Sequence, residues 1–323
     1  MKKIFLFTVF FLLQNSLHAF VKINNDHLHS IYGKDDRKFV NQCSDKKIKE
    51  ISKSIALIMP SRYIEKNKND TKLKANPLFN IPFSYDTDPE INICKNQKFV
   101  EHLAAGLCTG FLVTKNLLVT ARHCFKEEFI CGERAIIFNV QSSLENKNSI
   151  LVNNDNVYAC KKIYNLIEDE KFSKTSELDF VIIELDRDVL DATPLKMRSK
   201  NNITEKSKVF MIGHPLGLPL IKTSDAKVKL IDSVFTFEAS LDSFEGNSGS
   251  PIFNAKNFEV EGILYSGKED FTKDVANQCL KYKKYKETSK NSESILSVLP
   301  IQNALDVILD LKNQDAWAFQ LHP

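Results

Sequence analysis

The sequence has little glycine, no internal repeat and no large excess of charge of either sign. Its 323 residues include ten Gly and are 43% apolar, which excludes a collagen-like repeat and a disordered chain. The formal net charge is +3 and no basic stripe stands out early in the chain, so nucleic acid is not an implied partner. We therefore expect a globular protein of one large or two modest domains.

No apolar run is long enough to span a membrane. The longest, from Ile4 to Leu13, has ten residues, whereas a membrane-spanning helix needs about 20. Two lysines precede it, and polar Gln14, Asn15 and Ser16 lead from it to Leu17-His18-Ala19, a pattern typical of a secretory signal peptide. We predict that residues 1–19 are a signal peptide and that 20–30 are a short propeptide or leader. The mature protein is then secreted or periplasmic, with no membrane attachment.

Cysteine is present, but no C-x-x-C pair is. In an oxidising compartment cysteines form disulfides more often than metal sites, so we predict neither a metal nor a cofactor. Because the number is odd, one cysteine is free, is bonded to another chain or is a small buried residue. The seven are Cys43, Cys94, Cys108, Cys124, Cys131, Cys160 and Cys279.

Short apolar runs rich in Ile, Val and Phe recur along the chain and predict the strands of an all-β barrel or sandwich. They cover residues 54–59, 110–120, 135–140, 180–185, 209–212 and 260–264. Residues 300–312 instead carry apolar side chains at helical spacing and have Pro300 in the first turn, so we predict a C-terminal helix there. The Lys-rich stretch 281–286 is expected to be an exposed loop.

The segment GNSGSP at residues 246–251 places two glycines around Ser248. Glycines permit a tight turn with unusual backbone angles and no side-chain crowding. Such a turn can expose a serine hydroxyl and point neighbouring N–H groups at one spot, where an oxyanion would form. The alternative is an ordinary Gly/Ser hairpin.

His123 closes a second informative segment. Residues 109–120 have the pattern of a hairpin with its turn at Lys115-Asn116. That hairpin would bring Cys108 near Cys124 and hold His123 at the strand end, so we predict a Cys108–Cys124 disulfide that fixes the backbone of the imidazole. A histidine held in this way is suited to act as a base.

Asp179 opens a third segment, a strand-like run of mostly apolar residues up to Leu185. A carboxylate at that position is at least partly buried and needs a partner, which an imidazole can supply. The alternative is a carboxylate that only caps a turn.

Together the three segments resemble the motifs of the chymotrypsin-like (trypsin-like) serine peptidases. TARHC at 120–124, DFVIIEL at 179–185 and GNSGSP at 246–251 match that family's histidine, aspartate and serine motifs in the same chain order. Residues 31–37, 213–217 and 262–267 are similar to segments of the bacterial secreted branch that includes the glutamyl endopeptidases. An α/β-hydrolase is excluded, because its order is Ser, Asp, His and it uses G-x-S-x-G.

The resemblance covers roughly residues 30–312 and implies two six-stranded antiparallel β-barrels with the active site between them. The first barrel would span about residues 45–195 and the second about 196–299, followed by the helix at 300–312 and a tail at 313–323. His123 and Asp179 would belong to the first barrel and Ser248 to the second.

Carried over residue by residue, the resemblance makes Ser248 the nucleophile, His123 the base and Asp179 the residue that orients the imidazole. The N–H groups of Gly246 and Ser248 would form the oxyanion hole. Ser266 and Gly267, at the end of a strand, would bind the substrate backbone.

Specificity is left open by the sequence. Asp242 stands where trypsin-like enzymes have the pocket base that selects Lys or Arg, but it can equally be a turn or structural carboxylate. Leu264 stands where the glutamyl endopeptidases have a histidine, which counts against glutamate specificity. Asn247 offers no charge for the ion pair that activates many animal relatives.

We therefore predict a secreted serine endopeptidase that acts as a monomer on protein or peptide substrates. The principal competing hypothesis is a catalytically inactive trypsin-like fold that acts as a protein-binding module. The sequence is also compatible with a non-peptidase esterase and with a purely structural disulfide-bonded protein.

Overall fold

The computed structural model describes residues 30–85, 88–125, 131–141, 149–164, 178–199, 202–286 and 291–321. The predicted signal peptide lies outside the described residues, as does the predicted leader except for Ser30. Ser30 is fully buried, and its carbonyl oxygen accepts the N–H of Ser243 at 2.9 Å. This residue is therefore part of the folded body.

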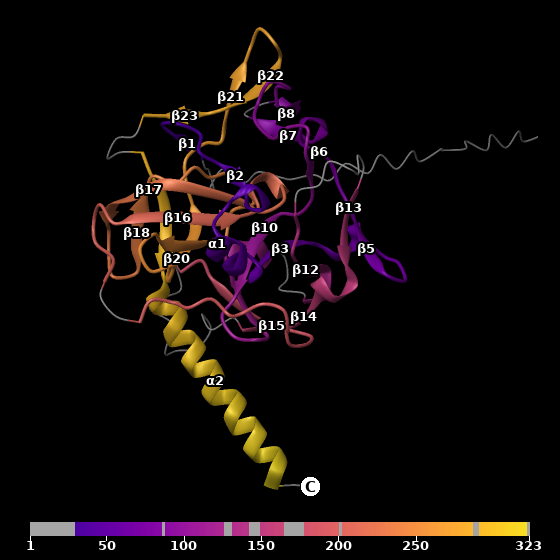
Figure 1. The fold of residues 1–323 in the computed structure, drawn as a ribbon, viewed down its shortest axis with the longest axis vertical. Coiled ribbons are helices and arrows are strands. Elements are labelled where there is room, and N and C mark those ends of the chain that lie inside the picture. The colour runs from indigo at the N-terminus through magenta and orange to yellow at the C-terminus, as the bar shows by residue number, and fades with distance from the viewer. Residues whose placement is uncertain are drawn as a thin grey trace, which may run out of the picture.

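The first half of the chain forms a closed barrel of six antiparallel strands in the order β10-β11-β15-β14-β12-β3 (Figure 1). The strands are β3 (Ile55–Pro60), β10 (Cys108–Leu112), β11 (Leu117–Thr120), β12 (Arg134–Phe138), β14 (Val157–Tyr164) and β15 (Val181–Leu185). In β15, Val181 and Ile183 belong to the core of this barrel, whereas Ile182 faces a cluster shared with the second barrel. A strand with both faces buried has a continuous apolar sequence, as these runs do.

A second six-stranded antiparallel barrel follows, in the order β16-β19-β20-β24-β18-β17, and pairing of β16 with β17 closes it. Its strands are β16 (Lys208–Gly213), β17 (Ile221–Ile231), β18 (Thr236–Ala239), β19 (Pro251–Asn254), β20 (Val260–Ser266) and β24 (Glu293–Ser297). The short strand β2 (Lys38–Phe39) adds to the outside of β17. The predicted fold class, two six-stranded barrels with a C-terminal helix, is confirmed.

Short strands and 3-10 turns connect and flank the barrel strands. The remaining strands are β1 (Ile31–Tyr32), β4 (Ile64–Lys66), β5 (Asp70–Lys74), β6 (Asn76–Pro77), β7 (Pro82–Tyr85), β8 (Asp88–Asn92), β9 (Leu103–Ala104), β13 (Ser149–Asn153), β21 (Phe271–Asp274), β22 (Cys279–Tyr282) and β23 (Lys284–Tyr285). Single 3-10 turns cover Val40–Gln42, Ser61–Tyr63, Leu78–Asn80, Arg122–Phe125, Cys131–Glu133, Asn154–Asn156 and Pro215–Gly217.

The expectation of an exposed loop at residues 281–286 is wrong. This stretch completes β22 and forms β23. Each of the two tyrosines there lies between lysines, and Tyr282 is buried while the lysines stay more accessible. An alternation of apolar and polar residues is a strand pattern, which the lysine content concealed.

Two α-helices are described, α1 (Lys46–Ser52) and α2 (Val298–Leu321). The predicted helix at 300–312 is present but extends to Leu321, because residues 313–321 contain neither Gly nor Pro to end it. Its C-terminal part projects away from the barrels (Figure 1). None of the described helices is long and apolar enough to cross a membrane.

The first turns of α2 pack into the cluster between the barrels. Ile301, Ala304 and Ile308 are fully buried in this cluster, which also contains Leu178 and Phe180. Because Leu178 and Phe180 flank Asp179, this shared cluster helps to fix the segment that carries the predicted catalytic aspartate.

Candidate active site

His123 and Asp179 are joined at two points. Antiparallel pairing of β11 with β15 sets Thr120 opposite Val181, which brings the turn after β11 beside the residues before β15. The backbone N–H of His123 donates to Oδ1 of Asp179 at 2.9 Å, and Nδ1 of the ring lies 2.5 Å from Oδ2. One carboxylate therefore holds both the backbone and the ring. An imidazole that donates from Nδ1 keeps Nε2 as the atom that can accept a proton.

A disulfide borders this pair. Cys108, the first residue of β10, is bonded to Cys124, which directly follows His123. Cys94 is bonded to Cys279 and Cys131 to Cys160, while Cys43 is free. The Cys108 and Cys124 sulfurs and a ring nitrogen of His123 lie within 4.8 Å of one another, as metal ligands would. Both sulfurs are bonded to each other, however, so neither is a thiolate able to hold a metal.

The Ser248 loop is held by strands of both barrels. The backbone N–H of Thr109 in β10 donates to the Ser248 carbonyl at 2.9 Å, and the Thr109 hydroxyl donates to the Gly246 carbonyl at 2.8 Å. From the second barrel, the Leu264 carbonyl in β20 accepts the Gly249 N–H at 2.8 Å. These bonds fix the loop on both sides of Ser248.

The two glycines of this loop are required by its shape. Gly246 has φ +91° and Gly249 has φ +83°, a region that side-chain-bearing residues rarely adopt. A Cβ on Gly249 would lie 2.2 Å from the Thr109 carbonyl oxygen. Only glycine lets the loop lie this close to β10.

The segments that carry the three predicted catalytic residues are in contact where the barrels meet. His123 and Asp179 belong to the first barrel, and the Ser248 loop of the second is bonded to β10 beside them. The Sγ atom of Cys124 lies 4.0 Å from the Ser248 carbonyl oxygen, so the histidine turn and the serine loop are in contact.

The two predicted oxyanion-hole donors have a common property. Among the residues that the structure describes, the N–H groups of Gly246 and Ser248 donate no hydrogen bond, whereas those of Asn247 and Ser250 bond within the loop. These two N–H groups, on either side of Asn247, can therefore donate to the oxyanion of a tetrahedral intermediate.

Asp242 is buried beneath the N-terminal segment. Its Oδ1 accepts the Tyr32 N–H at 2.7 Å and its Oδ2 accepts the Asp36 N–H at 3.3 Å. Burial raises the pKa of this carboxyl to about 7, although the Tyr32 N–H opposes the shift. Both oxygens are thus engaged with the protein's own backbone, which favours the structural alternative for Asp242.

Ser266 and Gly267 lie at the end of β20, the strand that also contacts the serine loop. Leu264 in this strand donates its N–H to the Ser250 carbonyl at 3.0 Å, and Ser266 pairs with Ser294 of β24. The Leu264 side chain is fully buried in the core of the second barrel. It therefore faces no pocket in which it could take the place of a recognition histidine.

Sequence reasoning missed a threonine that positions the site. The Thr109 hydroxyl donates to Gly246 and accepts the backbone N–H of His214 at 3.0 Å, while the Thr120 hydroxyl donates to the Thr109 carbonyl at 2.6 Å. Both threonines are fully buried. A buried hydroxyl in an apolar strand must find partners, so Thr109 within an apolar run was the available signal.

His214 is a structural histidine. It is fully buried, and its Nδ1 is hydrogen-bonded to the Leu218 carbonyl at 2.8 Å within the turn that follows β16. Burial lowers its pKa to about 4, so it is neutral at physiological pH.

The match to a known family lies over the described site. Residues 108–263 match the trypsin-like peptidase domain. This stretch, just under half of the chain, is therefore similar to that domain, and the resemblance of the sequence motifs to the chymotrypsin-like serine peptidases is confirmed.

Two solved structures are similar to this chain. A Glu endopeptidase is 13% identical over 86% of this chain and 98% of its own, with a TM-score of 0.49. The VesB protease of Vibrio cholerae is 12% identical over 81% of this chain and 64% of its own, with a TM-score of 0.45. No curated protein sequence matches the chain at a significant level.

Proposed function

We propose that the protein is a serine-type endopeptidase with His123, Asp179 and Ser248 as its catalytic residues. The observation that carries the proposal is the two-point attachment of His123 to Asp179 beside a serine loop clamped between the barrels. A histidine held in one tautomer and one orientation is what general base catalysis requires.

The proposed reaction has two halves. The Ser248 hydroxyl oxygen attacks the carbonyl carbon of a peptide bond as Nε2 of His123 takes the hydroxyl proton, and the N–H groups of Gly246 and Ser248 bind the resulting oxyanion. The carbon–nitrogen bond then breaks while His123 gives that proton to the departing amine, which leaves an acyl group on Ser248. A water molecule, deprotonated by His123, attacks the acyl carbon, and the proton returns to Ser248 as the acid product leaves.

We further propose that the enzyme is exported and acts as a monomer without a cofactor. Three disulfides, which persist in oxidising compartments, support export. N-terminal sequencing of the exported fraction tests this, and we expect a chain that begins at Phe20, or near Ser30 where the leader is also removed. An unprocessed chain that stays inside the cell contradicts it.

Cleavage of a mixed peptide library, with products identified by mass spectrometry, tests the catalytic assignment. We expect the unmodified protein and a Ser233→Ala control, altered at an exposed serine, to cut, and Ser248→Ala to fail. A fluorophosphonate should label the first two proteins on Ser248 and leave Ser248→Ala unlabelled. Absence of both cutting and labelling from the unmodified protein would favour an inactive fold that binds other proteins.

Cleavage after Lys or Arg is the specificity that Asp242 would confer as a pocket base. The same library measures it, with Asp242→Asn as the comparison. If Asp242 is the pocket base, Asp242→Asn loses cleavage after Lys and Arg. If it is the structural carboxylate that its bonds to Tyr32 and Asp36 favour, the cleavage pattern stays and only thermal stability falls.

A further inference from the structure

Glu245 directly precedes Gly246, one of the two predicted oxyanion donors, and is held by two backbone hydrogen bonds. Its N–H donates to Oδ2 of Asp270 at 2.9 Å, and its carbonyl oxygen accepts the N–H of Leu216 at 2.5 Å. Gly246 lies against the same turn, because a Cβ on Gly246 would be 2.5 Å from the His214 carbonyl oxygen. The position of the Gly246 N–H therefore depends on where Glu245 is held.

The side chains of Glu245 and Asp270 are two neighbouring carboxyls, and each has an oxygen without a partner. Oε2 of Glu245 and Oδ1 of Asp270 are both buried and accept no hydrogen bond from the residues that the structure describes. Asp270 as a whole is only 6% exposed. Burial without partners disfavours the charged form of a carboxyl, and a second carboxyl nearby disfavours it further. This arrangement therefore fits two protonated carboxyls better than two carboxylates.

The charged and titratable groups around Asp270 do not neutralise it. They are Arg37, Glu293 and the phenol of Tyr282, in addition to Glu245. Arg37 donates to both oxygens of Asp35, and its NH1 nitrogen has no hydrogen-bond partner in the described part of the chain. Glu293 is fully buried and would add negative charge. Burial raises the pKa of Asp270 well above its usual value, and the neighbouring Glu245 carboxyl adds to the shift.

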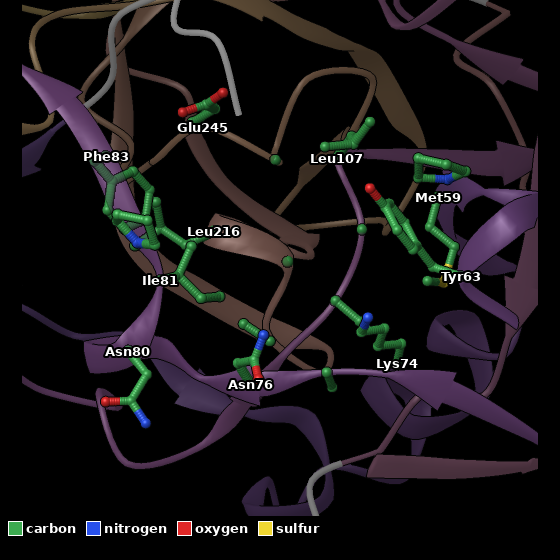
Figure 2. A pocket seen from close by; sticks show the side chains of 18 residues that line it. Met59, Tyr63, Lys74, Asn76, Asn80, Ile81, Phe83, Leu107, Leu216 and Glu245 are labelled. Carbon is green, nitrogen blue, oxygen red and sulfur yellow. The ribbon is translucent and has the colours of Figure 1, made fainter. Parts of the chain in front are cut away.

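On its other side, Glu245 borders a cavity of about 240 Å³. The other titratable residues that line this cavity are Tyr63 and Lys74. Lys74 is exposed and lies on the side opposite Glu245 (Figure 2), so it does not neutralise the carboxyl. Burial raises the pKa of Glu245 to about 7. The cavity has room for several water molecules, at about 30 Å³ each, so an ionised Glu245 side chain can turn toward water there.

We propose that Glu245 and Asp270 form a pH switch that acts on the oxyanion hole. While both carboxyls are protonated, the bonds of Glu245 to Asp270 and Leu216 hold Gly246 in place. When Glu245 gives its proton to the solvent, the carboxylate turns away from Asp270 toward the cavity, and the backbone of Gly246 moves with it. The enzyme then loses activity as the pH rises. This inference rests on the proposed function and adds a control of the same site.

The switch limits activity on the alkaline side, whereas His123 limits it on the acid side. His123 must be unprotonated to act as the base, and Glu245 must be protonated to hold the oxyanion donor. Activity is therefore confined to a band of pH between the two ionisations. A bell-shaped profile of this kind reports the behaviour of the carboxyl pair as a unit.

The test is the pH dependence of kcat/KM from pH 6 to 9, measured with an end-blocked peptide that has no ionisable side chain. Each rate is divided by the rate of the same variant at pH 6.5, so that a general effect of a substitution cancels. We expect the unmodified enzyme to lose activity roughly tenfold or more between pH 7 and 9, and Glu245→Gln to lose less than about twofold. Glu205→Gln, at an exposed glutamate, is the control and should lose as much as the unmodified enzyme.

Asp270→Asn tests the partner of Glu245. The amide oxygen can still accept the Glu245 N–H, but the second carboxyl is gone. The alkaline loss of activity should then be smaller than in the unmodified enzyme and larger than in Glu245→Gln. The proposal is overturned if the unmodified enzyme keeps its activity up to pH 9, or if either variant loses as much as the unmodified enzyme does.

Hydrogen exchange separates this inference from the proposed function. If no peptide is cut at any pH, the endopeptidase proposal fails, and the switch is then tested without catalysis. Amide exchange in residues 241–250, followed by mass spectrometry and divided by the intrinsic rate at each pH, should be roughly tenfold faster at pH 9 than at pH 6.5 in the unmodified protein. In Glu245→Gln it should stay constant. The same rise in both proteins, or no rise in the unmodified protein, overturns the switch.

Discussion

The backbone N–H of Thr109 donates a hydrogen bond to the carbonyl oxygen of Ser248, 2.9 Å away. A strand of the first barrel thereby holds the predicted nucleophile, which the second barrel carries. The Thr109 hydroxyl adds a bond to the Gly246 carbonyl, so both ends of the predicted oxyanion-hole segment depend on one residue. The relative position of the two barrels and the shape of the serine loop are thus fixed by the same contacts.

Replacement of Thr109 by Val should impair catalysis more than stability. Valine has a similar shape but leaves the Gly246 carbonyl and the His214 N–H without their bonds, each worth about 1 kcal/mol. We expect kcat/KM to fall roughly tenfold and fluorophosphonate labelling of Ser248 to slow in parallel. Thr272→Val, at an exposed position of β21, is the control and should match the unmodified enzyme. Unchanged labelling by Thr109→Val would contradict a positioning role.

Glu245 should make the protein less stable as the pH rises. Burial raises its pKa from about 4.5 to about 7. In the unfolded chain the carboxyl ionises near pH 4.5, whereas in the folded protein it stays protonated until about pH 7. The stability that the neutral form contributes is therefore complete below pH 4.5 and is lost as the pH rises through 7.

Glu245→Gln removes this titration while it keeps the side chain's shape. Melting temperatures between pH 4 and 8 should converge with those of the unmodified protein at the acid end. At pH 8 the variant should be more stable by about 3 kcal/mol, which is what a pKa raised from about 4.5 to about 7 implies. Glu205→Gln, at an exposed glutamate, should reproduce the unmodified pH dependence. Parallel curves for Glu245→Gln and the unmodified protein would show that Glu245 is not the group responsible.

Removal of the Cys94–Cys279 disulfide should mainly lower stability, whereas removal of the Cys108–Cys124 disulfide should mainly lower kcat. Cys94 and Cys279 are 185 residues apart and Cys108 and Cys124 are 16 apart, so loop-closure entropy predicts losses of about 5 and about 3 kcal/mol respectively. Only the second bridge adjoins His123. We expect the Cys94→Ala, Cys279→Ala double variant to lose more unfolding free energy in urea, and the Cys108→Ala, Cys124→Ala variant to lose more kcat. The reverse order in kcat would contradict the role assigned to the Cys108–Cys124 bridge.

The strands could be predicted because most of them carry a local signal. The runs that became β3, β12, β15, β16 and β20 are apolar on both faces, since one face fills a barrel and the other packs between barrels or against neighbouring elements. A strand that is buried on both faces therefore has a continuous apolar sequence, which can be recognised without the structure. The end of α2 was missed because the apolar stripe ends near Leu311, whereas the helical backbone needs only the absence of a breaker to continue.

The contacts that join distant parts of the chain at the site could not be predicted from the neighbouring residues in the sequence. The hairpin indicated the proximity of Cys108 and Cys124, but the Cys94–Cys279 bridge joins segments 185 residues apart. Likewise, nothing near Asp242 in the sequence indicates that the backbone of Tyr32 and Asp36 occupies its oxygens. Residue types predict what a group can do, whereas the fold decides which partner it meets.

The helix α2 should support the site through the cluster around Asp179. Ile308 is fully buried in the cluster that contains Leu178 and Phe180, whereas Leu311 on the same helix is 46% exposed. Ile308→Ala should cost about 2–4 kcal/mol of unfolding free energy, and Leu311→Ala should cost less than about 0.5 kcal/mol. Both changes remove an apolar side chain from one helix, and the difference in helix propensity between Ile and Leu is only a few tenths of a kcal/mol, well below the expected difference in stability.

A catalytic readout shows whether this packing reaches the active site. If the cluster fixes the Asp179 segment, Ile308→Ala lowers kcat several-fold at a temperature where the variant is fully folded, and Leu311→Ala leaves it unchanged. If Ile308→Ala loses stability but keeps kcat, the two bonds from Asp179 to His123 suffice to hold the carboxylate, and the helix serves only to bind the barrels together.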